Sequence, residues 1–321
     1  MWVGPVSQDL IVGELRKFSE AAKTESVRVP AYGYGNWEGG ASRYARDGEK
    51  IMIHFHGGSY IHGTAHPQDP TCSILKDLLK QKSSGLDRAL SVDYRLCTTA
   101  PYAMKPITFA SPFLDALSSY VHVTRELLFH PQNVIISGDS AGGHLALVLV
   151  RYLRDNPSLG LGMPGGLLLF SPWVDPMGTR YQFGSGRGPA NAGIYDYLNM
   201  WIISDYSTGA YAKKALFDHI GLSNDEAAQN PYITPASLHL KPSALLDLFS
   251  NFPPTYIVSG DAEALIDEIR ILVHRMSDNL PEGGVSYDEV PDAIHDFIVF
   301  SVWEPERSNA LRKVAAWVHG L

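Results

Sequence analysis

The stretch NVIISGDSAGGHLALVLV (residues 133–150) decides the fold, because an apolar run turns into a helix-like run across a serine between glycines. Gly138-Asp139-Ser140-Ala141-Gly142 fits the Gly-x-Ser-x-Gly elbow, in which a strand turns directly into a helix and exposes a serine hydroxyl at the corner. The glycines remove side chains that would collide across the turn. The pattern alone also fits an ordinary Gly-rich turn, but the strand before it and the helix after it favour a nucleophilic Ser140.

Five further apolar runs rich in β-forming residues predict the other strands of a buried sheet. They are KIMIHFH (50–56), ALSVDY (89–94), GGLLLFS (165–171), TYIVSG (255–260) and VSYDEV (285–290). Apolar spacing near the helical repeat predicts helices at 67–82, 112–128, 141–155, 263–279 and 306–319. Strands that alternate with helices predict an α/β fold with a mostly parallel, doubly wound sheet and helices on both faces.

Two regions do not follow this alternation, namely residues 1–45 and the insertion 175–221. The insertion is rich in glycine and then in aromatic residues, and a long insertion between strands is usually functional. We expect one domain over residues 1–321, with both regions forming a cap over one end of the sheet.

The amino-acid composition and the net charge indicate which partners and which cellular location to expect. The chain has 321 residues, of which 45% are hydrophobic and 19% charged, as in soluble globular proteins. The net charge of −8, without a run of Lys or Arg, argues against nucleic acid as a partner. No signal peptide and no stretch of ~20 apolar residues is present, so we expect no membrane span and a cytosolic location. Cys72 and Cys97 are expected to be free thiols.

A serine needs a base to take its proton and a carboxylate to orient that base. His295, in DEVPDAIHDFIVF (288–300), follows the last predicted strand and comes after Ser140, as the base does in α/β-hydrolases. Asp261 and Glu263 follow the preceding strand, and the residues alone do not separate them as the acid.

The segment HFHGGSY (54–60) ends a strand with two glycines and predicts a loop whose backbone N–H groups bind a developing oxyanion. Four histidines, namely His54, His56, His62 and His66, gather around this segment. No carboxylate or cysteine stands at zinc-like spacing near them, so we expect neither a metal nor a cofactor.

Taken together, these motifs resemble the hormone-sensitive-lipase-like branch of the α/β-hydrolases, which includes bacterial esterases, arylacetamide deacetylases and fungal secondary-metabolite esterases. The resemblance runs from about residue 50 to the C-terminus. It rests on HGGSY (56–60), SVDYRL (91–96), GDSAGG (138–143), SPWVD (171–175), the acid segment after Pro253-Pro254 and HDF (295–297).

The resemblance implies a role for each matched residue. Ser140 falls on the family's nucleophile and His295 on its base. The acid segment Asp-Pro-Leu-x-Asp-Glu, laid on PPTYIVSGDAEALIDE (253–268), brings the catalytic aspartate onto Glu263 and leaves Asp261 as the fallback. A glutamate there is longer by one methylene, which the loop must accommodate.

The resemblance also implies an oxyanion hole formed by the backbone N–H groups of Gly58, Ser59 and Ala141, with Gly57 shaping the loop. Ser59 stands where the family usually has a third glycine, but a backbone donor survives this change. The segment CTTAPYAMKPITFASP (97–112) departs from the family pattern, so that wall of the site is expected to be reshaped.

The sequence therefore predicts a serine esterase for carboxylic esters of small to medium apolar substrates. Tyr195, Tyr197, Trp201 and Tyr206 of the insertion either line an apolar pocket or pack as core. Two alternatives stay open: the same serine used for acyl transfer, lactonisation or other chemistry on a polyketide-like metabolite, and a non-catalytic binding protein on a hydrolase scaffold. The expected partner is a small-molecule ester, and a homodimer is an option that the sequence leaves open.

Overall fold

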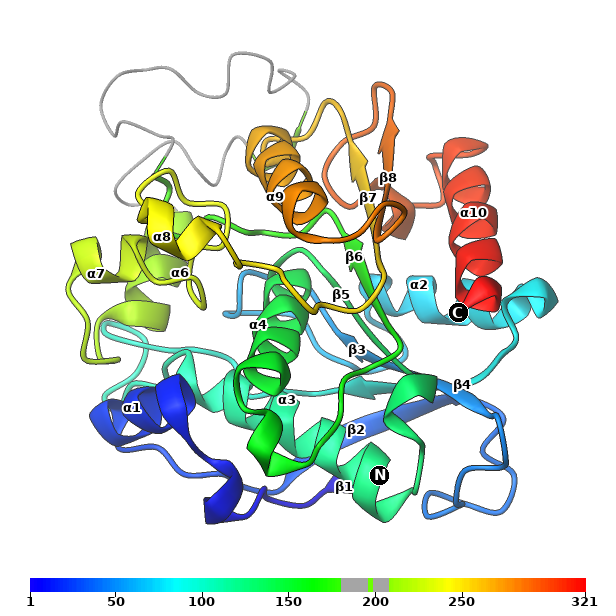
Figure 1. Ribbon diagram of the computed structural model, residues 1–321, viewed down its shortest axis with the longest axis horizontal. Helices are drawn as coiled ribbons and strands as arrows, with labels where there is room; N and C mark the ends of the chain where they lie inside the picture. The colour runs from blue at the N-terminus through cyan, green and yellow to red at the C-terminus, as the bar shows by residue number, and fades with distance from the viewer. Residues whose placement is uncertain (180–195, 199–207) are drawn as a thin grey trace.

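The computed structural model describes residues 1–179, 196–198 and 208–321, and it is built around one eight-stranded sheet (Figure 1). The strand order is β1-β2-β4-β3-β5-β6-β7-β8. The strands are β1 (Trp2–Val3), β2 (Val29–Gly35), β3 (Lys50–Phe55), β4 (Leu86–Val92), β5 (Val134–Asp139), β6 (Gly166–Phe170), β7 (Thr255–Gly260) and β8 (Val285–Val290). From β4 to β8 every pairing is parallel, whereas β1 and β2 pair antiparallel.

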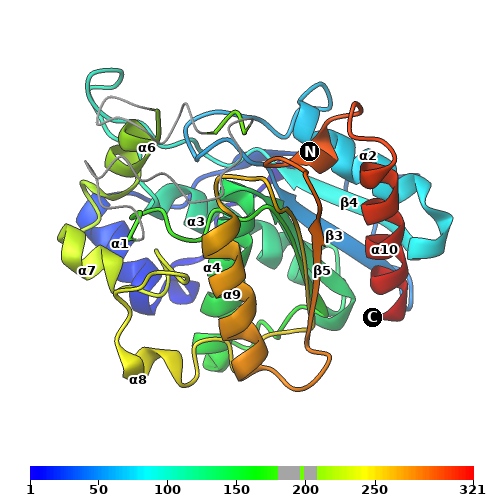
Figure 2. The same ribbon diagram turned by 90° about the horizontal axis from the view of Figure 1, so that it is seen from above.

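Helices cover both faces of the sheet, as Figure 2 shows. The described helices are α1 (Gly13–Ala22), α2 (Ser73–Lys80), α3 (Ala110–Val121), α4 (Ala141–Asp155), α6 (Thr208–Phe217), α7 (Asn224–Ala228), α8 (Pro242–Leu245), α9 (Ile266–Asn279) and α10 (Glu306–Gly320). Helices α3, α4 and α9 pack on one face, and α2 and α10 on the other. The predicted mostly parallel α/β architecture is confirmed.

Alternation along the buried strands explains how one chain builds two cores. In β5, Val134 and Ile136 belong to the core under α3 and α4, whereas Ile135 belongs to the core under α2 and α10. Successive side chains of a strand point to opposite faces, so a continuous apolar run is needed where both faces are covered. This is why β6 (GLLLF), with every residue buried, is recognisable in the sequence as an unbroken apolar run, whereas β8 (VSYDEV), with mostly half-buried residues, is not one.

The N-terminal region differs from the prediction, because β1 and β2 lie within residues 1–45 but belong to the sheet and not to a cap. The segment VPAYGYG of β2 contains proline and glycine, which are uncommon in strands. It pairs antiparallel with β4, from Ala31 opposite Val92 to Gly35 opposite Arg88. Helix α1 lies outside the sheet and packs on α3.

Several helix boundaries shift for local reasons. Helix α2 begins at Ser73 and not near residue 67, because Asp69 accepts the N–H of Thr71 and caps a 3-10 turn over Pro70–Cys72. Helix α3 ends at Val121 and continues as a π-helical turn over residues 122–126.

The structure also bears on the two cysteines and on membrane-spanning helices. Cys72 and Cys97 are both buried and free, as expected. Within the described part of the chain, no helix combines the length and apolar character that crossing a membrane requires.

Candidate active site

Ser140 lies at the corner between β5 and α4, with φ 50° and ψ −117°. Positive φ is rare for a residue with a side chain, so the surrounding structure must hold the corner. A Cβ at Gly138 would collide with the carbonyl of Gly142, and a Cβ at Gly142 would collide with the carbonyl of Phe55. Gly138 is therefore required for β5 to turn into α4, and Gly142 for α4 to pass close to the end of β3, which explains the motif physically.

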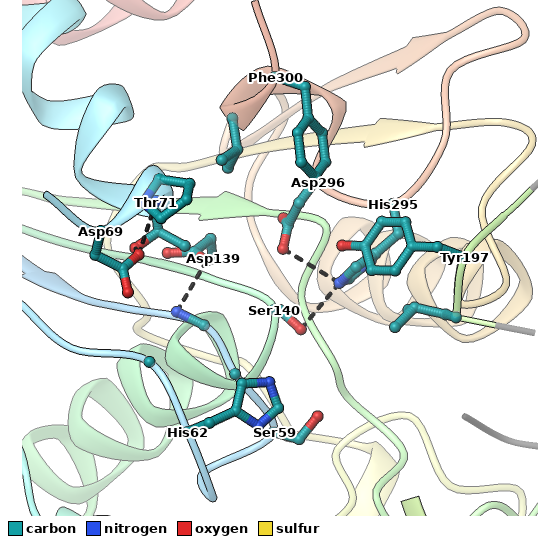
Figure 3. A pocket seen from close by; sticks show the side chains of 16 residues that line it. Ser59, His62, Asp69, Thr71, Asp139, Ser140, Tyr197, His295, Asp296 and Phe300 are labelled. Atoms are coloured by element: carbon teal, nitrogen blue, oxygen red, sulfur yellow. Dashed lines mark hydrogen bonds and ion pairs between the residues drawn. The ribbon is translucent and has the colours of Figure 1, made fainter. Parts of the chain in front are cut away.

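Three loops at the carboxyl ends of parallel strands bring Ser140, His295 and Glu263 together. Ser140 follows β5, Glu263 lies between β7 and α9, and His295 follows β8. His295 Nε2 lies 3.0 Å from Ser140 Oγ, and His295 Nδ1 lies 3.1 Å from Glu263 Oε2 (Figure 3 shows the first contact). All three residues are buried, with Ser140 8% exposed and Glu263 fully enclosed.

Asp261, the fallback acid, has a different partner. Its Oδ1 accepts the backbone N–H of Asp292 at 2.6 Å, which links the loop after β7 to the loop after β8. The structure thus brings Glu263, and not Asp261, into contact with His295.

The electrostatics of this group follow from burial and charge. Burial raises the pKa of Glu263, and contact with His295 partly opposes this. Burial by itself lowers the pKa of His295, but two adjacent carboxylates, Asp296 and Glu263, raise it well above its ordinary value. The neighbouring charges therefore favour the protonated imidazole.

The loop after β3 carries an unusual run of left-handed residues, with φ of 109° at Gly58, 52° at Ser59 and 62° at Tyr60. A Cβ at Gly58 would collide with the carbonyl of His62, so the first of these positions requires glycine. Within the described residues, the backbone N–H groups of Gly58, Ser59 and Ala141 donate no hydrogen bond to protein. The loop can thus offer these donors to a ligand beside Ser140.

Asp139 holds this loop in place and was missed in the sequence analysis, although it directly precedes the serine of the motif. Its Oδ2 accepts the N–H of Gly57 at 2.8 Å, and its Oδ1 lies 3.0 Å from Nε2 of His54. Asp139 and His54 are fully buried. Gly57 therefore shapes the loop through Asp139 and does not point its N–H at the pocket.

We expect Asp139→Ala to lower the free energy of unfolding by about 2–4 kcal/mol, because it leaves the N–H of Gly57 and the Nε2 of His54 buried without a partner. It should also lower the kcat of the ester turnover predicted from the sequence, since the predicted oxyanion loop loses its anchor. Urea denaturation measures the first effect and ester turnover the second. Asp139→Asn, which keeps an oxygen for Gly57, should be milder in both, and equal losses in the two variants would contradict this role.

The histidines near the loop are used for packing and hydrogen bonding. The His56 ring stacks on Tyr94, with centroids 4.2 Å apart. In α4, His144 accepts the hydroxyl of Tyr60 at 2.7 Å on Nδ1 and donates from Nε2 to the carbonyl of Ile233 at 2.8 Å. Burial lowers the pKa of His144 to about 4. Among the described residues, no group of three or more His, Cys, Asp or Glu is arranged to hold a metal.

A cavity of about 260 Å³ opens above Ser140 and His295. Its apolar wall comes from Tyr197, Leu198, Val299 and Phe300. The rings of Tyr197 and Phe300 meet edge to face, with centroids 6.0 Å apart. Tyr195, Trp201 and Tyr206, predicted with Tyr197 to line or pack the cap, lie outside the described residues.

Comparisons with known proteins place the chain by family and fold. A family model described as the α/β-hydrolase fold matches residues 52–299. An esterase of Acinetobacter venetianus is 26% identical over 275 residues, which cover 85% of this chain and 75% of that protein. The structure of EstE7, a hormone-sensitive-lipase homologue from a metagenome library, is 25% identical with a TM-score of 0.64, covering 91% of this chain and 82% of that one. A metagenomic hormone-sensitive lipase with 24% identity has the same TM-score and coverage, and shows a similar fold.

Proposed function

This chain belongs to the family of proteins with the α/β-hydrolase fold, and from that premise we propose that it is a serine esterase acting through Ser140, His295 and Glu263. The chain is a carboxylic ester hydrolase, in line with the esterase and lipase names of its relatives. The observation that carries the proposed triad is the position of His295, with one ring nitrogen 3.0 Å from Ser140 and the other 3.1 Å from Glu263.

The mechanism follows from the atoms in contact. Ser140 Oγ attacks the ester carbonyl carbon while His295 Nε2 takes the hydroxyl proton, and Glu263 stabilises the imidazolium that results. The negative charge on the former carbonyl oxygen is bound by the backbone N–H groups of Gly58, Ser59 and Ala141. His295 returns the proton to the leaving alcohol, and water then releases the acyl group by the same route.

The cavity suits small to medium apolar esters. A volume of about 260 Å³ leaves room for a short acyl chain, and Tyr197 and Phe300 offer aromatic faces to it. Acyl transfer would use the same acyl-enzyme with an alcohol as acceptor in place of water. A cytosolic location stays a prediction from the sequence, whereas a homodimer and a role in secondary metabolism stay options that the sequence leaves open.

The proposal is tested by hydrolysis of p-nitrophenyl acetate and butyrate, together with labelling by a fluorophosphonate. We expect turnover of both esters and a single phosphonylated residue, Ser140, in the peptide map. Labelling without turnover would favour the specialised-enzyme alternatives. A chain that neither turns over esters nor reacts at Ser140 would favour the binding-protein alternative.

A further inference from the structure

Asp296 brings a second carboxylate to His295, on the side of the ring that faces Ser140. Its Oδ2 lies 3.2 Å from His295 Nε2, the same nitrogen that lies 3.0 Å from Ser140 Oγ (Figure 3). With Glu263 at Nδ1, both nitrogens of the imidazole face a carboxylate. The Asp296 side chain is 9% exposed, so water screens its charge only weakly.

Local backbone structure does not account for this carboxyl group. Asp296 precedes the short 3-10 helix Phe297–Val299, but its side chain makes no capping hydrogen bond. Its own N–H donates to Ser171 Oγ at 3.1 Å, and φ is 51°. Within the described residues, Oδ1 has no hydrogen-bond partner, which costs about 1–3 kcal/mol for a buried polar atom. The nearest charged partner of the carboxyl group is therefore His295.

The protons of this pair decide whether Ser140 has a base. A neutral His295 that donates Nδ1–H to Glu263 has one lone pair, on Nε2, and Ser140 must donate its O–H there. An ionised Asp296 has no proton to donate and attracts only an Nε2–H. Protonated His295 can donate its Nε2–H to the Asp296 carboxylate, but it then has no lone pair to accept the proton of Ser140. The form in which His295 can act as base for Ser140 therefore holds one proton fewer than the ion pair of protonated His295 and ionised Asp296.

The pKa directions agree with this geometry. Asp296 and Glu263 overcome the effect of burial and raise the pKa of His295 well above its ordinary value. Burial raises the pKa of Asp296 to about 7, although His295 opposes the shift. The two groups titrate as a pair, so a pH profile reports the pair and not one residue.

Other titratable groups around the pair are mostly acidic. Asp139 at the end of β5 and Asp196 contribute negative charge, and burial raises the pKa of the Tyr197 hydroxyl, which therefore stays neutral. Burial lowers the pKa of His62, which lines the same cavity. No lysine or arginine is among the described residues that line the cavity. Because the nearby charges are negative and the described lining residues include no lysine or arginine, the surroundings favour keeping the proton on the Asp296–His295 pair.

On the basis of the proposed roles of Ser140 and His295, we propose that Asp296 is a positioning residue whose carboxylate accepts a hydrogen bond from the Nε2–H of protonated His295. Ser140 then gains its base only when the Asp296–His295 pair has lost one proton. In acylation the proton that leaves Ser140 Oγ forms Nε2–H again. The Asp296 carboxylate stabilises that imidazolium until the proton passes to the leaving alcohol. Asp296 therefore lowers activity at low pH and raises it at high pH.

The test is the pH profile of kcat/KM for Asp296→Asn, measured with p-nitrophenyl acetate at a wavelength where the product's absorbance does not depend on pH. Asparagine matches aspartate in size and tolerates the left-handed backbone. We expect the midpoint of the acid limb to move to lower pH by about one unit or more. The profiles should cross, with the variant faster below the crossing point and slower above it. An unmoved midpoint overturns the inference.

Two controls separate charge from backbone strain. Asp292→Asn removes an exposed carboxylate from the same loop, at a residue that is also left-handed with φ 58°, and should leave the midpoint unchanged. Asp296→Gly removes the carboxylate and relieves the strain, so it should reproduce the shift seen with asparagine. A glycine variant that keeps the parental midpoint overturns the inference.

Failure of this inference can be told from failure of the esterase proposal. The rate of Ser140 labelling by a fluorophosphonate also needs His295 as base, so its pH dependence gives the midpoint without a substrate. A parent protein that neither hydrolyses esters nor is labelled overturns the proposed function. A reactive parent with the same midpoint in Asp296→Asn overturns only the role of Asp296.

Discussion

Ser140→Ala should abolish ester turnover, with kcat falling by about five to six orders of magnitude, because removing the nucleophile of a triad costs nearly as much as removing the whole triad. The proposed oxyanion donors are backbone N–H groups, so they remain in the variant and leave only a residual rate above that of the reaction in water. Hydrolysis of p-nitrophenyl butyrate under saturating conditions measures the loss. Turnover within tenfold of the parent would mean that another group carries out the attack.

A matched variant shows that this loss is chemical and not a consequence of unfolding. Alanine retains the Cβ of Ser140 and therefore the strain at φ 50° and ψ −117°. Ser140→Gly loses the hydroxyl and also relieves the strain, which is typically about 1–3 kcal/mol at such positions. Both variants should be inactive, whereas glycine should give the higher melting temperature. Equal melting temperatures would contradict a strained corner.

The parts of the site that the sequence predicts are those set by local contacts. Gly138 is needed because a Cβ there would collide with the first turn of α4, whereas Gly142 is needed because α4 passes close to the carbonyl of Phe55 in β3. The requirement at Gly138 acts over five residues, so a short motif records it. The buried strands are equally readable, since covering both faces of the sheet requires unbroken apolar runs.

Other features depend on contacts between distant segments and leave a weaker local signal. Strand β2 is recognised only through its pairing with β4, since Pro30 and two glycines obscure its pattern. Asp261 and Glu263 are two residues apart, and only the path of the loop decides which one meets His295. Asp296 directly follows the predicted base, yet the sequence does not reveal that its left-handed backbone turns the carboxyl group back onto Nε2.

The second large effect on kcat is expected from the carboxylate that contacts His295. Glu263→Gln should lower kcat by about 10,000-fold, because an amide at this position carries no charge to stabilise the imidazolium and does not fix the ring in the reactive tautomer. Little loss of stability is expected. Glu263 is fully enclosed, and burial disfavours its charged form and so raises the pKa of its carboxyl group, which means that a neutral amide of the same size costs little there. Steady-state kinetics with p-nitrophenyl acetate and a thermal melt measure the two effects.

Asp261→Asn is the matched control, because it makes the same chemical change two residues away on the same loop. The Asp261 carboxylate accepts the N–H of Asp292, and an amide oxygen can accept the same hydrogen bond. We therefore expect a loss of less than about tenfold, since the ring of His295 keeps its partner. If Asp261→Asn were the more damaging change, the loop after β7 would have to rearrange during catalysis. The acid would then be Asp261, and the contact between Glu263 and His295 would belong only to the resting site.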